Sequence, residues 1–219
     1  MTARPDAPPP SPVATSPAPA PAPEDLARRA TRDHGPRLLA LAANAIVQGL
    51  DGGAPAVPAL ASEPAALAEP GAAFVTLTRR AGALRGCIGS VVAHRPLALD
   101  VVANAWAAAR RDPRFSPVGP DELADLSLSV SVLTTPESFP VADEADLVAR
   151  VRPGIDGLIL SDRGQRGLFL PQVWESLPRP ADFITHLKRK AGLPADHWSG
   201  TLTIERFEAC AVKDPHPWP

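Results

Sequence analysis

The sequence LSLSVSV at residues 126–132 alternates one apolar residue with one serine along its whole length. Neighbouring side chains of a β-strand point to opposite faces of the sheet, so this period of two predicts a strand. Leu126, Leu128, Val130 and Val132 are expected to face the core. The serine face is expected to meet water or a polar cleft.

The segment before this strand predicts a hairpin and a helix. Residues 74–78 and 84–92 are short runs rich in apolar and β-branched residues, and the turn at residues 79–82 joins them. This pattern is typical of a β-hairpin. A helix is expected from Pro96 to Arg111, where it must end because Pro113 disfavours helical geometry at the residue before it.

The beginning of the chain predicts two helices and a long connection. Residues 24–32 are compatible with a short helix, and Pro36 suits the first position of a second one. Glycines at residues 49–53 end the second helix. Residues 54–71 contain four prolines and are assigned to a loop, whose alanines and leucines suggest some contact with the core.

The segment after the strand repeats the combination of hairpin and helices. Helices are expected at residues 143–151 and 181–191, a hairpin at residues 155–160 and 167–170, and a last strand at residues 202–207. The strands arrive in pairs, with helices between the pairs. The sequence therefore predicts an α+β fold, with an antiparallel or mixed sheet and helices packed on it, and not a regular doubly wound parallel fold.

Composition narrows the class of protein. The chain has 219 residues, a formal net charge of −2 and 45% hydrophobic residues. Nine of its 28 prolines fall in residues 1–23, which are expected to form a disordered tail rather than part of a core. The near-neutral charge and the absence of a basic patch disfavour nucleic-acid binding.

Location and bound groups are predicted from what the sequence lacks. It has no apolar run of roughly 18 residues and no N-terminal signal pattern, so a soluble, cytoplasmic protein is expected. Its two cysteines are expected to be free thiols. The five histidines show no spacing typical of a metal site, and no fingerprint of a nucleotide or dinucleotide cofactor is present, so neither a metal nor a cofactor is predicted.

The sequence LRGCIG at residues 84–89 contains the most unusual candidate site. Arg85 and Cys87 are two residues apart on a strand and should share a face, where the arginine would favour the reactive thiolate. Gly86 and Gly89 suggest a bulge, or the close approach of another backbone or of a ligand. The alternative is a buried, inert cysteine in a twisted sheet.

Asp112 and Arg114 follow the predicted helix. They either form a structural corner or enter a cleft beside Cys87, where the arginine would clamp a carboxylate or phosphate. His94 has two possible roles as well, as a general base for Cys87 or as a residue that caps the helix beginning at Pro96. The spacing of these residues does not decide between the alternatives.

Seven motifs together resemble one known family, the AMMECR domain, called AmmeMemoRadiSam system protein A in prokaryotes. The motifs are LRGCIGS at 84–90, RPL at 95–97, DPRF at 112–115, SVSVL at 129–133, RPGIDGLIL at 152–160, RGLFLPQVW at 166–174 and LKRKAGLPADHW at 187–198. Their order and spacing make the resemblance specific.

The resemblance implies a domain at residues 24–213, made of a larger and a smaller subdomain around a cleft, with residues 214–219 as a short tail. It also implies a Memo-type protein and a radical SAM protein as partners. It supplies no established reaction. Two hypotheses follow: an enzyme or enzyme subunit that uses Cys87 as nucleophile or redox thiol, or a non-catalytic scaffold for these partners.

In the enzyme hypothesis, Cys87 and Arg85 are the catalytic residues. Gly86, Gly89, Asp112 and Arg114 contact a small polar or anionic substrate.

Overall fold

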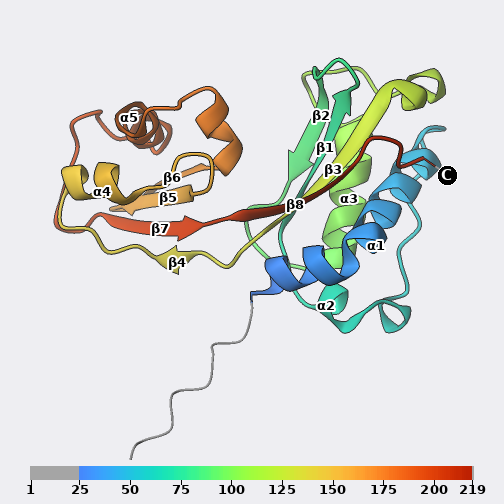
Figure 1. Ribbon diagram of the computed structural model, residues 1–219, viewed down its shortest axis with the longest axis horizontal. Helices are drawn as coiled ribbons and strands as arrows, with labels where there is room; N and C mark the ends of the chain where they lie inside the picture. The colour runs from blue at the N-terminus through green and yellow to red at the C-terminus, as the bar shows by residue number, and fades with distance from the viewer. Residues whose placement is uncertain (1–24, 219) are drawn as a thin grey trace, which may run out of the picture.

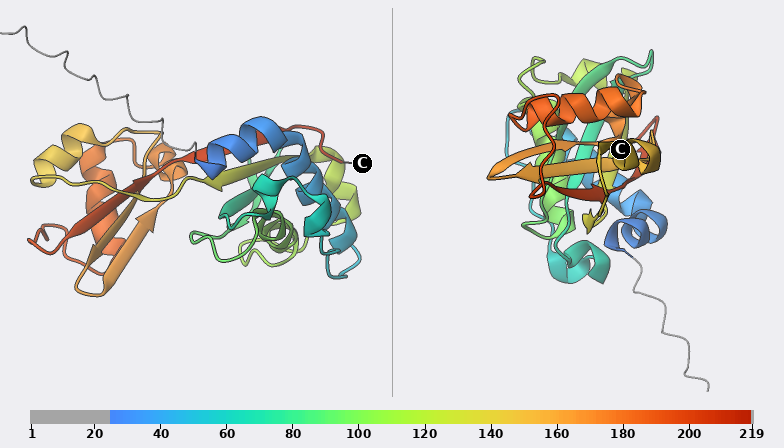
Figure 2. Two further views of the ribbon diagram at one scale, coloured as in Figure 1. Left: turned by 90° about the horizontal axis from the view of Figure 1, so that it is seen from below. Right: turned by 90° about the vertical axis from the view of Figure 1, so that its left-hand side faces the viewer.

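The computed structural model describes residues 25–218 and divides them between two subdomains (Figures 1 and 2). The tail expected at residues 1–23 lies outside this range. The large subdomain contains α1 (Leu26–Gly49), η1 (Leu60–Ser62), α2 (Ala65–Ala68), β1 (Ala73–Arg79), β2 (Leu84–Gly89), α3 (Leu97–Arg110), η2 (Pro120–Asp125), β3 (Leu126–Leu133) and β8 (Ala209–Asp214). The small subdomain contains β4 (Glu137–Ser138), α4 (Glu144–Arg150), β5 (Gly157–Asp162), β6 (Gln165–Phe169), η3 (Pro171–Glu175), α5 (Pro180–Lys190) and β7 (Thr203–Phe207). Within the described range, no helix is both long enough and apolar enough to span a membrane.

Each subdomain is built on a four-stranded sheet, with strand orders β2-β1-β3-β8 and β4-β7-β5-β6. Every strand pairing is antiparallel, which confirms the predicted α+β class. The chain leaves the large subdomain after β3 and returns to it through β8 (Figure 1). The last strand predicted from the sequence ends at residue 207, so β8 is an additional strand.

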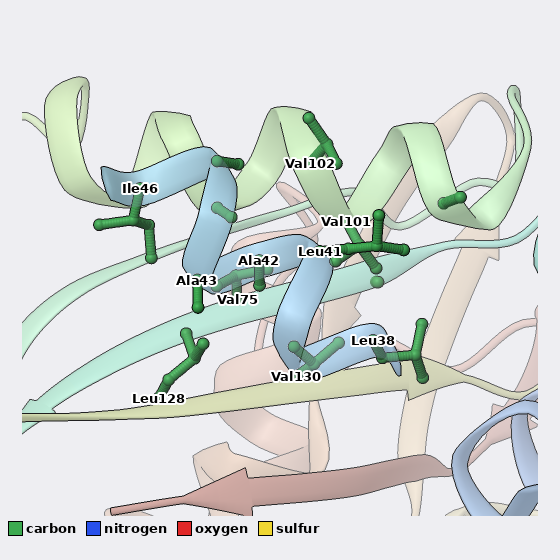
Figure 3. Close-up of a cluster of buried hydrophobic side chains, with 14 of the residues drawn as sticks. Leu38, Leu41, Ala42, Ala43, Ile46, Val75, Val101, Val102, Leu128 and Val130 are labelled. Atoms are coloured by element: carbon green, nitrogen blue, oxygen red, sulfur yellow. The ribbon is translucent and has the colours of Figure 1, made fainter. Parts of the chain in front are cut away.

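Two helices cover one face of the large sheet. Leu38, Leu41 and Ile46 of α1 and Val101 of α3 are buried against strands β1 and β3 (Figure 3). The two N-terminal helices predicted from the sequence form one element, α1, with a kink at His34 just before Pro36. The kink has a direct cause, because a proline inside a helix lacks the N–H donor and crowds the preceding turn.

The alternating strand lies at the centre of this sheet as β3. Leu128, Val130 and Val132 face the helices and are fully buried. The opposite face differs in part from the prediction, since Ser127 and Ser131 are buried as well. The Ser127 hydroxyl donates to the carbonyl of Thr78, and Ser131 lines a groove of about 420 Å³ shared with the small subdomain.

A buried carboxylate fixes the first hairpin to α3. Asp100 is fully buried and accepts hydrogen bonds from the Ala73 amide, the Ser90 hydroxyl, the Asn104 amide group and the Arg95 guanidinium, at 2.7–2.9 Å. A buried charge is tolerated when donors satisfy it completely. Asp100 therefore locks the ends of β1 and β2 onto the helix that follows them.

The two chain crossings between the subdomains are bonded to each other. The Thr134 amide donates to the Glu208 carbonyl at 2.9 Å, and the Glu208 amide donates to the Thr134 hydroxyl at 2.8 Å. The Glu208 carboxylate binds Arg28 of α1 and Arg152 of the small subdomain. Glu208 thus joins residues of both subdomains at these two crossings, which we call the hinge.

The fit of Gly86 against α3 leads to a first prediction. A Cβ atom at residue 86 would lie 2.3 Å from the backbone oxygen of Ala108, which cannot move without distorting the helix. We expect Gly86→Ala to lower the free energy of unfolding by roughly 1–3 kcal/mol, as other overpacked sites do. Urea denaturation measures this quantity.

Gly119→Ala is the matched control, because a Cβ atom at residue 119 meets nothing within 4 Å and the backbone there is extended. Its effect should stay within about 0.5 kcal/mol. Equal effects of the two substitutions would show that the contact between β2 and α3 is not as close as described.

Candidate functional site

Cys87 lies in the middle of β2, at the edge of the large sheet, opposite Thr76 of β1. Gly86 faces α3, so Cys87 projects from the face of the sheet that the helices leave uncovered. The Thr76 hydroxyl lies 3.3 Å from the Cys87 sulfur and donates to it. The cysteine is a free thiol and is partly exposed.

Asp112 anchors the loop after α3 to this strand. Its buried carboxylate accepts a hydrogen bond from the Cys87 amide at 2.8 Å, one from the Arg114 amide, and two from the Arg114 guanidinium at 2.9 and 2.7 Å. The Arg114 side chain, more than any other group, holds the pKa of Asp112 well below its usual value. Asp112 is therefore ionised and saturated with donors, so it suits a positioning role and not that of a proton acceptor.

Arg114 is the cation that lies beside Cys87. Its Nη2 atom donates to the Cys87 carbonyl at 3.2 Å as well as to Asp112. Asp112 is the main cause that raises the pKa of Arg114, and Cys87 adds to the same effect. Within residues 25–218 the Nη1 atom of this half-exposed side chain has no hydrogen-bond partner, so it is available to a ligand.

Arg85 is directed to a different partner from the one expected. The pairing of β1 with β2 passes from Gly86 to Leu84, which leaves Arg85 in a β-bulge, and bulges redirect side chains. The buried Arg85 guanidinium forms a two-pronged ion pair with Glu122 of η2, with both hydrogen bonds at 2.8 Å. The expectation that Arg85 favours the thiolate form of Cys87 remains a prediction. In the structure, the contacts of Arg85 hold η2.

Glu122 belongs to this network although it was not predicted as a site residue. It also accepts from Arg79 at 2.7 Å and from the Gly119 amide at 3.1 Å. The Arg85 hydrogen bonds are the main cause that lowers the pKa of Glu122 to about 2. No sequence signal could have found it, because Glu122 and Arg85 are 37 residues apart and only the folded chain brings them together.

Phe115 joins the two arginines of the site. The guanidinium carbons of Arg85 and Arg114 lie 5.7 and 5.5 Å from the centre of its ring. Both distances fall within the range of cation–π attraction. The DPRF motif thus contributes three adjoining roles: Asp112 holds β2, Arg114 lies beside the cysteine, and Phe115 packs against both cations.

The two glycines of the motif are packing positions. A Cβ atom at Gly89 would lie 2.2 Å from the ring of Phe74, and one at Gly86 would meet Ala108. The predicted bulge and close backbone approach are therefore both present, whereas substrate contact by these glycines remains a prediction. His94 lies in the loop after β2, where its Nδ1 atom is 3.0 Å from the Val92 carbonyl oxygen.

Comparison with known proteins identifies the family. The AMMECR1 family model matches residues 39–212. The chain belongs to the AMMECR1 family. The matched region includes β2 and the DPRF loop, so the whole AMMECR1 candidate site lies within it.

Similar proteins occur in archaea and bacteria. A protein of Methanothermobacter thermautotrophicus is 43% identical over 142 residues, covering 62% of this chain and 71% of the relative. A protein of Thermotoga maritima is 42% identical over 136 residues, covering 62% and 73%. The crystal structure of an uncharacterized protein from Pyrococcus horikoshii matches with a TM-score of 0.73 and 34% identity, covering 84% of this chain and 94% of that one.

The low pKa of Glu122 predicts how this AMMECR1 protein responds to acid. A carboxylate whose pKa is lowered from 4.5 to about 2 on folding stabilises the protein above pH 4.5, and this stability is lost as the pH falls toward 2. We expect Glu122→Gln to lower the free energy of unfolding at pH 7 by about 1–3 kcal/mol, because Arg85 loses its counter-charge. The variant should also lose less stability between pH 5 and pH 2 than the wild type.

Urea denaturation at a series of pH values measures both effects. Asp121→Asn is the matched control, since Asp121 is the exposed neighbour in the same turn and should show the wild-type pH dependence. Parallel pH profiles for wild type and Glu122→Gln would contradict the assignment of Glu122 as the counter-charge of Arg85.

Proposed function

We propose that the protein is an enzyme, or a subunit of one, in which Cys87 acts as nucleophile or redox thiol on a small polar or anionic substrate. The main support is the position of Arg114, which donates to the Cys87 carbonyl while Asp112 holds its guanidinium in place. The thiolate is the nucleophilic form of cysteine, and an adjacent cation attracts an anionic substrate to it.

The residues around Cys87 have different roles in this proposal. Arg114 would bind the anionic group of the substrate through its unoccupied Nη1 atom, as guanidinium groups bind carboxylates and phosphates. Asp112 fixes both Arg114 and the Cys87 backbone, and Thr76 donates to the sulfur. The ion pair of Arg85 with Glu122 holds η2, and the Arg85 guanidinium also lies near the ring of Phe115. In this scheme Cys87 and Arg114 meet the substrate, whereas Asp112 and Arg85 are positioning residues.

We also propose action together with a Memo-type protein and a radical SAM protein, which family membership supports. Co-expression of the three proteins, followed by purification through a tag on this chain, tests the association. We expect the wild type and Cys87→Ser to retain the partners equally, because the thiol serves chemistry and not docking. Failure to recover either partner with the wild type would contradict this part of the proposal.

Alkylation by a charged and a neutral reagent tests the role of Arg114. The Cys87 thiolate forms a bond to the methylene carbon of iodoacetate or iodoacetamide, and iodide leaves. In a Cys210→Ser background, where Cys87 is the remaining thiol, we expect Arg114→Gln to lower the ratio of the iodoacetate rate to the iodoacetamide rate. The reduction should be roughly threefold, the size of a charge pair near a protein surface.

Two control variants accompany this alkylation experiment. Arg111→Gln removes a guanidinium three residues earlier in the chain, which lies over Trp106 at 4.5 Å from the ring centre, and it should leave the ratio unchanged. A Cys87→Ser chain reports on Cys210, whose pKa is raised mainly by burial, and it should react more slowly. If Cys87 reacts no faster than Cys210, or if Arg114→Gln leaves the ratio unchanged, the proposal is wrong.

A further inference from the structure

A second candidate site lies between the two subdomains, and Cys87 is not among the residues that line it. It is a groove of about 470 Å³, within the size range of small-molecule sites. We name it the hinge groove, because Thr134 and Thr135 of the crossing between β3 and β4 form part of it. Its walls come from the segments before β1 and after β2 and from one face of the small sheet. The wall residues used below are Val91, Val92, Leu168 and Arg166.

The walls of the hinge groove are apolar and incompletely covered. Val91 and Val92 are 38% and 54% exposed, and they are two of the five most exposed large hydrophobic residues of the described chain. Leu168 of β6 and Phe207 of β7 line the same space from the small subdomain. Adjacent exposed apolar side chains in a concave site indicate a ligand with an apolar body.

The hinge groove contains hydrogen-bond donors that no described residue uses. Arg166 forms no ion pair or side-chain hydrogen bond with any residue from 25 to 218. The Thr134 oxygen accepts from the Glu208 amide, which leaves its hydroxyl proton free to donate. The one carboxylate of the lining, Glu69, is already paired with Arg29 at 2.7 Å. A ligand must therefore present acceptors or negative charge on the Arg166 side.

We propose that the hinge groove binds a small amphipathic anion, whose apolar body packs on Val91, Val92 and Leu168 while its carboxylate binds Arg166. Guanidinium is the side-chain group best suited to bind a carboxylate with two parallel hydrogen bonds. Since Cys87 and Arg114 are not part of the lining, this site is independent of the thiol chemistry proposed above. A ligand here would contact residues of both subdomains.

Three probes separate the two halves of the proposed ligand: octanoate has both, 1-octanol has only the chain, and acetate has only the charge. Calorimetric or NMR titration of the full chain gives the dissociation constants. We expect octanoate to bind at least tenfold more tightly than either of the other two. Arg166→Gln should weaken octanoate binding about tenfold, or 1.4 kcal/mol, and change 1-octanol binding less than twofold.

Val92→Ser tests the apolar half and should weaken octanoate and 1-octanol by the same factor. Arg163→Gln is the matched control, since Arg163 is an exposed arginine in the turn between β5 and β6, outside the groove. The proposal is overturned if octanoate binds no better than 1-octanol, or if Arg163→Gln and Arg166→Gln have equal effects.

Discussion

The Asp112 carboxylate is the constraint on which the candidate site depends. One buried group binds the backbone of β2 at Cys87 and both the backbone and the side chain of Arg114. Without this carboxylate, the Cys87 amide would lose its bond to the loop after α3, and the Arg114 side chain would lose the group that orients it. With it, the cysteine and the cation form one rigid unit, which is what a preorganised site requires.

The same principle recurs at other junctions of the chain. Asp100 joins the first hairpin to α3, Asp156 holds Arg152 and the turn before β5, and Asp162 collects hydroxyl and imidazole donors from residues 197–201. Each carboxylate is buried and satisfied by several donors, so that the cost of removing its charge from water is offset locally. Aspartates at the ends of strands and helices therefore set the positions of loops that apolar packing leaves undetermined.

The elements that could be predicted from the sequence are those in which apolar residues repeat at a regular spacing. The alternation in β3, the hairpin before it and α5 could be found because apolar residues repeat at the spacing of a strand or helix. Strand β8 was missed because the apolar residues facing the core are only Cys210 and Val212, within a run that includes alanines and charges. In the site, the proximity of Cys87, Asp112 and Arg114 was among the alternatives. The ion pair of Arg85 with Glu122 could not be predicted, because it depends on a one-residue bulge in β2 and on a glutamate 37 residues away.

The most direct test of the central claim follows the Cys87 amide proton by NMR as the pH is lowered from 7 to 3. If Asp112 holds this amide and has a strongly lowered pKa, the chemical shift stays constant over that range. A titration of the Cys87 amide with a midpoint near 3.9, the value of an unperturbed aspartate, would contradict the account.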